Sequence, residues 1–174
     1  MNNLIVFCGP SACGKSTLIG KIIEQYPDFD FIDVFNYIQK YKDETGHIEP
    51  AGSLAAHQEM HQDLGKMDKN LILEIGTNRE ELNMSGINNL KDKFNIKVIF
   101  CLLDAETCIQ RVLDRTQGDQ KRVISPLDLA AKFQRVFPDN HIKLALEFDL
   151  PYIEMNMAQS LEERLSIIQQ LINS

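Results

Sequence analysis

The sequence has few prolines and glycines, fewer basic than acidic residues, and no long apolar run. Its four cysteines, Cys8, Cys13, Cys101 and Cys108, form no C-x-x-C pair, which argues against a cysteine zinc site and predicts reduced thiols rather than disulfides. Eighteen Lys and Arg against twenty-five Asp and Glu give a formal charge of −7. This balance disfavours broad electrostatic binding to nucleic acid or to anionic membranes. Any anion-binding site must therefore be local.

Few glycines and prolines and a 44% share of hydrophobic residues exclude a disordered or fibrous chain and predict a folded core. No apolar stretch approaches the roughly 20 residues that span a bilayer, and the opening Met1-Asn2-Asn3 lacks the basic start of a secretory signal. We expect a cytoplasmic protein without a membrane partner. The length of 174 residues and an apolar run that begins at Leu4 predict a single domain over residues 1–174.

Apolar runs of strand length alternate with segments of helical spacing. The strand-like runs are Leu4–Cys8, Phe29–Val34, Leu71–Ile75, Val98–Leu103 and Tyr152–Met155. Several are apolar throughout, as expected for strands buried on both faces of a parallel sheet. Helical spacing covers residues 53–69 and 104–115, and Ser125-Pro126 is typical of a helix start. The order predicts an α/β fold, a three-layer sandwich around a five-stranded parallel sheet.

A phosphate-binding motif follows the first expected strand. Residues 9–16 fit G-x-x-x-x-G-K-[ST], and an expected helix follows them. Glycines allow backbone N–H groups to turn toward phosphate oxygens, and the helix start adds unpaired amides. Lys15 supplies charge to the β and γ phosphates, and Ser16 offers a hydroxyl to Mg²⁺. We therefore predict binding of ATP and Mg²⁺ as cofactors by a P-loop made of Gly9, Pro10, Ser11, Ala12, Cys13, Gly14, Lys15, Ser16 and Thr17.

Two acidic residues end expected strands, where α/β sheets bind ligands. Asp33 follows the second strand, where it is a candidate catalytic residue that accepts the proton of an acceptor hydroxyl or orients it; the alternative is an aspartate that caps a turn or helix. Glu74 lies in the third strand, where it is a candidate ligand of Mg²⁺ through water; the alternative is a packed, hydrogen-bonded carboxylate.

The motifs together resemble the small P-loop kinases, the group that contains nucleoside monophosphate kinases and shikimate kinase. No [NT]-K-x-D segment of GTPases or LSGGQ-like signature of ABC ATPases occurs, and the chain is short for an AAA+ module. The likeness runs from Leu4 to about Ile168. Residues 9–17 look like the loop of guanylate kinase, 31–39 like a shikimate kinase segment, and 71–79 like adenylate kinases or the D-x-T-N turn of polynucleotide-kinase-like enzymes.

The resemblance implies roles for a basic segment and a boundary for the acceptor site. Residues 103–122 are similar to the helix and small mobile lid of the group, with a lid at about 116–125. Arg111 best matches the position beside the adenine, Arg115 also binds nucleotide, and Arg122 best matches the catalytic lid arginine; for each, a solvated helix face is the alternative. The acceptor segment is expected at about residues 34–69.

The acceptor segment contains no arginine, since none occurs between Ile22 and Asn78. Arginine is the favoured ligand for bidentate recognition of phosphate or carboxylate, so we favour a neutral hydroxyl acceptor. His57 and His61, one helical turn apart, are candidates for metal ligation, for lining the acceptor pocket, or for ordinary packing.

The function predicted from these residues is an ATP- and Mg²⁺-dependent kinase that phosphorylates a small molecule: a nucleoside, nucleotide or other metabolite. A polynucleotide 5′-hydroxyl or toxin-like sugar-nucleotide kinase is an alternative, although the acidic composition disfavours nucleic acid. A non-catalytic ATP-binding regulatory module is another. The oligomeric state does not follow from these residues.

Overall fold

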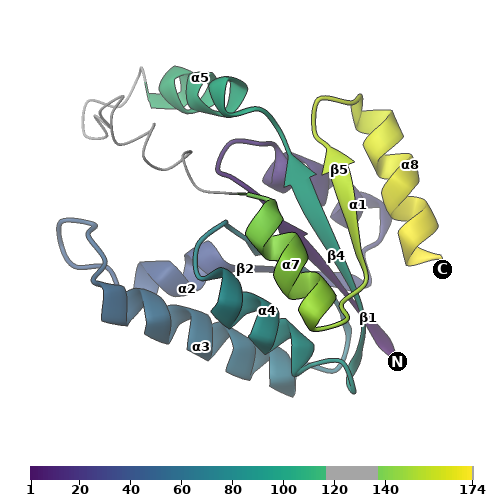
Figure 1. The fold of residues 1–174 in the computed structure, drawn as a ribbon, viewed down its shortest axis with the longest axis horizontal. Coiled ribbons are helices and arrows are strands. Elements are labelled where there is room, and N and C mark those ends of the chain that lie inside the picture. The colour runs from purple at the N-terminus through teal and green to yellow at the C-terminus, as the bar shows by residue number, and fades with distance from the viewer. Residues whose placement is uncertain (117–136, 174) are drawn as a thin grey trace.

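A five-stranded, all-parallel sheet forms the centre of the computed structural model, which describes residues 1–116 and 137–173, apart from the side chains of Arg115 and Thr116 (Figure 1). The strands are β1 (Asn2–Cys8), β2 (Phe29–Asp33), β3 (Asn70–Ile75), β4 (Phe94–Leu102) and β5 (Tyr152–Asn156). They lie in the order β2-β3-β1-β4-β5. The predicted α/β class and the five-stranded parallel sheet are confirmed.

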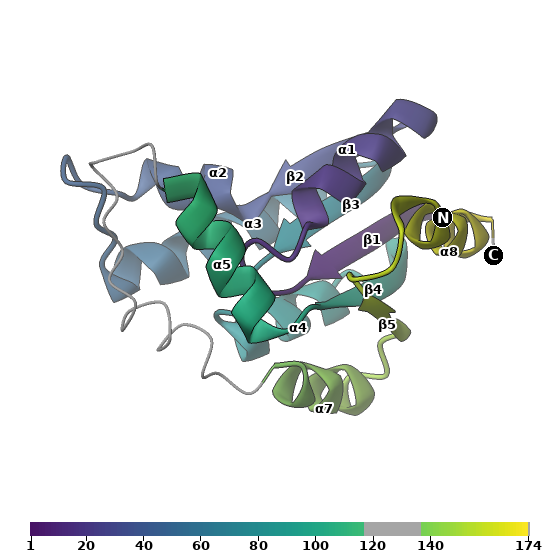
Figure 2. The same ribbon diagram turned by 90° about the horizontal axis from the view of Figure 1, so that it is seen from above.

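Helices cover both faces of the sheet and make the three layers (Figure 2). The described helices are α1 (Lys15–Gln25), α2 (Val34–Lys40), α3 (Pro50–Lys66), α4 (Glu80–Asn88), α5 (Ala105–Thr116), α7 (Asp139–Glu147) and α8 (Leu161–Ile172). Apolar residues of α1, α5 and α8 pack with one face of the sheet. Residues of α2, α3, α4 and α7 pack with the other. Two apolar cores therefore enclose the sheet.

The expected element boundaries shift where a local signal was missed. The second strand ends at Asp33 rather than Val34 because the Asp33 side chain caps α2. Helix α3 begins at Pro50 rather than residue 53, with proline in the first turn, a position where its missing N–H costs nothing. Strand β4 begins at Phe94 rather than Val98 because its first half pairs with β1. The helix start expected at Ser125-Pro126 lies outside the described residues.

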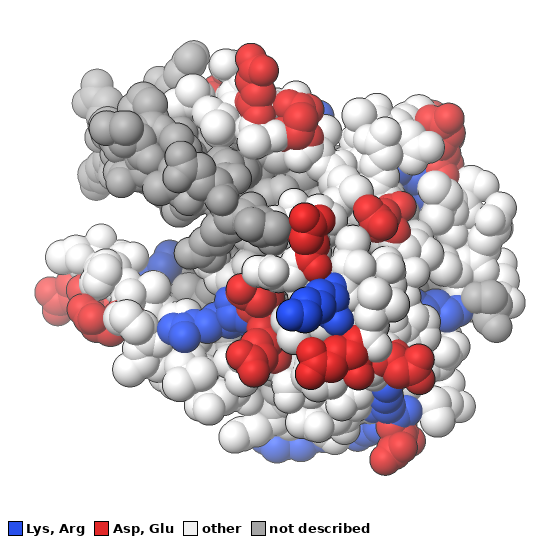
Figure 3. Space-filling view, viewed as in Figure 1, with Lys and Arg blue, Asp and Glu red and all other residues white. Residues whose placement is uncertain are grey.

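The described surface shows interleaved charges and no membrane helix. On the face that carries α3, α4 and α7, acidic and basic side chains alternate rather than forming one basic patch (Figure 3). Within residues 1–116 and 137–173, no helix is long and apolar enough to cross a bilayer.

Candidate active site

The P-loop joins the end of β1 to the start of α1. A Cβ on Gly9 would lie 2.8 Å from the Cys101 carbonyl oxygen, so only glycine allows the loop to approach β4 this closely. Gly14 has a φ of 102° and Ala12 a φ of 63°, left-handed values that favour residues without a bulky Cβ. Gly14 caps α1 without any side-chain hydrogen bond, which leaves the first amides of α1 available to an anion.

Lys15 lies in the loop with its ammonium group almost covered. Its side chain is only 6% exposed, and Nζ donates hydrogen bonds to the carbonyl oxygens of Gly9 at 2.9 Å and Pro10 at 3.0 Å. Nζ also lies 3.7 Å from Oε1 of Glu74. The loop therefore holds a positive charge at a fixed place beside the amides of α1.

Ser16 and Glu74 meet at the carboxyl end of the sheet. The Ser16 hydroxyl lies 3.1 Å from Oε1 and 3.0 Å from Oε2 of Glu74. Burial raises the pKa of the Glu74 carboxyl, and although Lys15 and Ser16 lower it, the net change is upward; Asp33 raises it further. A hydroxyl and a carboxylate are oxygen ligands of the kind Mg²⁺ prefers. The two predicted metal ligands are thus adjacent, and their chemistry fits that ion.

Asp33 is the N-cap of α2 and also a neighbour of Glu74. Its Oδ1 accepts a hydrogen bond from the Phe35 amide at 2.8 Å, so the capping alternative is present in the structure. Asp33 is the register partner of Glu74 in the pairing of β2 with β3, and its charge acts on the Glu74 carboxyl. Capping occupies one carboxylate oxygen at the mouth of the site.

Two arginines border the far side of the P-loop. Arg111 donates from Nη1 to the Ala12 carbonyl oxygen at 3.3 Å. A Cβ built on Gly14 would lie 3.8 Å from Nη1 of both Arg111 and Arg164. Arg164, in α8, was missed by the sequence analysis, although it is the one arginine after Arg135. The side chain of Arg115, and Arg122 with nearly all of the expected lid, lie outside the described residues.

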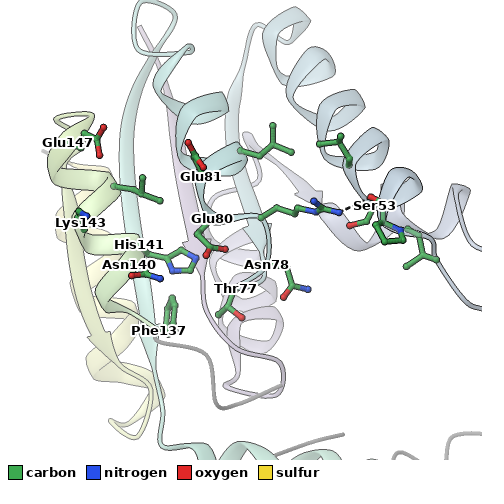
Figure 4. Close-up of a pocket in the computed structure, with 16 residues that line it drawn as sticks. Ser53, Thr77, Asn78, Glu80, Glu81, Phe137, Asn140, His141, Lys143 and Glu147 are labelled. Atoms are coloured by element: carbon green, nitrogen blue, oxygen red, sulfur yellow. Dashed lines mark hydrogen bonds between the residues drawn. The ribbon is translucent and has the colours of Figure 1, made fainter. Parts of the chain in front are cut away.

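A cavity of about 1050 Å³ opens beyond the carboxyl end of β3 (Figure 4). Its walls come from the start of α3, from the turn and first residues of α4, and from α7. The lining residues are Ile48, Pro50, Ser53, Leu54, Thr77, Asn78, Arg79, Glu80, Glu81, Leu82, Phe137, Asn140, His141, Lys143, Leu144 and Glu147. The turn at residues 76–79, which resembles that of polynucleotide-kinase-like enzymes, therefore contributes to a cavity large enough for a small ligand.

Residues 4–138 match a protein family described as "AAA domain", AAA_33. The chain belongs to this AAA domain family. The chain is shorter than expected for an AAA+ module, but the family match shows that its length does not exclude an AAA domain. No curated protein sequence matches the chain.

Solved structures similar to this AAA-domain chain are kinases by their descriptions. A candidate kinase of Chloroflexus aurantiacus J-10-fl superposes with a TM-score of 0.72 at 17% identity, over 99% of this chain and 96% of that one. The deoxyadenosine kinase of M. mycoides with bound dATP gives 0.63 at 14%, over 99% and 100%. The shikimate kinase of Acinetobacter baumannii in complex with shikimate gives 0.63 at 19%, over 99% and 93%. The likeness establishes the fold of the small P-loop kinases.

The four cysteines of the AAA domain are buried free thiols, as predicted. A hydrogen bond from Cys101 and the charge of Lys15 lower the pKa of Cys13 to about 6, against the effect of burial. Burial raises the pKa of Cys8 to about 12. Cys13 is fully covered within the loop, so it acts there as a small packed residue.

His57 and His61 lie on α3, where His61 contacts α4, and neither lines the cavity. His57 Nδ1 bonds to the Ser53 carbonyl at 2.8 Å, and His61 Nε2 to Asn83 Oδ1 at 3.2 Å. Burial lowers the pKa of both rings. Among the described residues, no group of three or more His, Cys, Asp or Glu could hold a metal ion. The packing alternative fits these contacts.

Proposed function

We propose that this AAA-domain chain is an ATP- and Mg²⁺-dependent kinase, and that the whole of residues 1–174 forms one kinase domain. The observation that carries the proposal is that Lys15 and Ser16 of the P-loop both contact Glu74 at the carboxyl end of a parallel sheet, Lys15 at 3.7 Å and Ser16 at 3.0 Å. The product is a phosphorylated small molecule. The family match and the kinase fold of the structural neighbours support this reading.

The P-loop fits the triphosphate of ATP. The amides at the start of α1 and the Lys15 ammonium bind phosphate oxygens, and Arg111 and Arg164 border the nucleotide on the side of Gly14. Ser16 and Glu74 would hold Mg²⁺, which supplies charge neutralisation to the phosphate oxygens. Thr17, exposed in the first turn of α1, completes the nucleotide site.

The acceptor side begins at Asp33, directly before the acceptor segment proposed at about residues 34–69. With Oδ1 engaged by the Phe35 amide, Oδ2 orients the acceptor hydroxyl and accepts its proton as the phosphoryl group transfers. From the sequence alone we propose that Arg122 neutralises the transferring group and that Arg115 adds to nucleotide binding, with the lid at about 116–125.

Release of ADP from Mg²⁺-ATP, measured with and without small-molecule acceptors, tests the proposal. Lys15→Ala is expected to weaken ATP binding by at least about tenfold because it removes a charge-assisted contact. Asp33→Asn keeps the helix cap, since asparagine caps as well as aspartate, and should lower kcat about 10²- to 10⁴-fold with ATP affinity unchanged. Asp30→Asn, on the same strand and paired with Lys69, is the matched control and should retain full activity.

The results separate the alternatives. Tight binding of Mg²⁺-ATP with no phosphoryl transfer to any acceptor would contradict the kinase and support the non-catalytic ATP-binding module. Transfer to oligonucleotides with a steep salt dependence would favour the polynucleotide kinase, although the formal net charge of −7 argues against it. No ATP binding at all would refute both kinase and module.

A further inference from the structure

His141 is a buried polar residue that has no role in the P-loop site described above. The residue is 2% exposed, and neither ring nitrogen has a hydrogen-bond partner within the described parts of the chain. Its ring packs edge-on against Phe137 at 5.0 Å and Phe100 at 6.1 Å between ring centroids. Buried polar atoms are nearly always satisfied, so two orphaned nitrogens in one ring indicate a role other than stability.

The orphaned ring lies at the wall of the large cavity. His141 extends from α7 toward Glu80 and Thr77, with Asn140 beside it (Figure 4). Burial lowers the pKa of His141, and the charge of Glu80 only partly offsets this, so the ring is neutral near pH 7. A neutral imidazole offers one donor and one acceptor. Together with the carboxylate of Glu80, this gives the cavity a compact set of groups that recognise hydroxyls.

The cavity lies beside the phosphate site. Its first lining residue after β3 is Thr77, three positions beyond Glu74, and the Cys8 thiol at the end of β1 donates to the Gly76 carbonyl at 3.4 Å. The Glu80 charge acts both on Cys8, directly before the P-loop, and on His141. A molecule bound at Glu80 therefore lies near His141 of α7 and near the end of β1 that leads into the P-loop.

The charges of the lining disfavour an anionic acceptor. Three acidic side chains, Glu80, Glu81 and Glu147, outnumber Arg79 and Lys143. Arg79 is the one arginine of the described lining, and it already donates to the Pro50 carbonyl at 2.7 Å. Its backbone has a φ of 57°, a strained value of the kind that accumulates at functional turns.

We infer that this cavity binds the phosphoryl acceptor, and that the acceptor is an uncharged, hydroxyl-rich small molecule of the nucleoside or sugar class, held by His141 and Glu80. The inference rests on the proposed kinase activity. Each ring nitrogen of His141 exposes less than 1 Å², so a hydroxyl reaches it when Phe137 or Glu80 turns aside. One acceptor oxygen then forms the bond to the γ phosphorus, the bond to the β–γ bridging oxygen breaks, ADP leaves, and the hydroxyl proton passes to Asp33.

An acceptor screen and two cavity variants test the inference. ADP release is measured with nucleosides, with pentoses and hexoses, and with nucleoside monophosphates and hydroxy acids as anionic comparison arms. Stimulation by an uncharged arm is expected. Glu80→Gln should raise KM for that acceptor about tenfold, since a charged hydrogen bond is lost, with the Kd of ATP unchanged. Glu162→Gln, an acidic residue in the first turn of α8 and outside the cavity, is the matched control.

His141→Phe separates recognition from packing. The aromatic contacts remain and the orphaned nitrogens disappear, so the variant is expected to melt no lower than the parent protein while its acceptor KM rises about three- to tenfold. In the parent protein labelled with ¹⁵N-histidine, addition of the stimulating nucleoside or sugar should shift the ring resonances of His141 and leave those of His57 in place.

Three outcomes would overturn the inference while the kinase stands: stimulation by monophosphates or acids alone, unchanged acceptor KM in both cavity variants, or His141 resonances that do not move. Mg²⁺-ATP binding without stimulation by any uncharged acceptor would also overturn it. Absence of ATP binding would instead refute the proposed function.

Discussion

Among single residues, Glu74 combines a half-buried carboxylate with two partners, and this burial should make the proposed binding of Mg²⁺-ATP sensitive to pH. An acid with a raised pKa takes up its proton at a higher pH, so Glu74 becomes neutral somewhat above its ordinary value of 4.5. The neutral carboxyl is a poor cation ligand. Titration calorimetry from pH 7.5 to 5 should show affinity for Mg²⁺-ATP weakening, by up to about tenfold per pH unit below that pKa.

Glu74→Gln supplies the reference for this titration, because the protonation of ATP itself affects both proteins equally. The variant should bind Mg²⁺-ATP more weakly and without the extra pH dependence. Since a raised pKa means that the native state favours the neutral form, the ionised carboxylate lowers the free energy of unfolding near pH 7. The variant should therefore be as stable as the parent or more so. Parallel pH curves for the two proteins would contradict the assignment.

At the scale of secondary-structure elements, the contact of α3 with α4 depends on Gly86 of α4, which has no side chain and faces His61 of α3. A Cβ there would lie 2.6 Å from the His61 ring, whereas a Cβ on Gly20 in α1 would meet nothing within 4 Å. Gly20→Ala should raise the free energy of unfolding by about 0.5–1 kcal/mol through helix propensity. Gly86→Ala should lower it by about 1–3 kcal/mol through overpacking. Urea denaturation of both variants measures the contrast; equal effects would show that His61 moves aside freely.

The elements also show which parts of the sequence are informative. The P-loop, β1 and the start of α1 were predicted because the chemistry of phosphate binding dictates residue types at adjacent positions. The early half of β4 alternates apolar and polar residues from Phe94 to Lys97, and a search for continuous apolar runs overlooks it. The contact between Ser16 and Glu74 could be predicted because the P-loop after β1 and the end of β3 lie at the same edge of a parallel sheet. Arg164 and His141 reach their sites only through tertiary packing of α8 and α7, which no local pattern records.

Across the molecule, three histidines have pKa values that burial lowers: His57 and His141 are buried, and His61 is half-buried. Because these pKa values are lowered in the native state, the unfolded chain takes up protons at a higher pH than the native state does. The free energy of unfolding should therefore fall as pH decreases from 7 toward 5.5. Each contributes up to about 1.4 kcal/mol per pH unit. Urea denaturation across this range tests it, with His47→Gln as control because His47 is exposed. A flat profile would contradict the burial of these rings.

The position of β1 between β3 and β4 has a consequence for the evolution of the sequence. The strand β1, which leads into the P-loop, is hydrogen-bonded to a strand on each side. Among the described strands, β2, which ends at Asp33, pairs only with β3. Amino-acid replacements in β2 and in the helix α2 that follows it should therefore disturb fewer packing neighbours than replacements in β1. In evolution, the proposed nucleotide site can therefore stay constant while the specificity for the proposed acceptor changes.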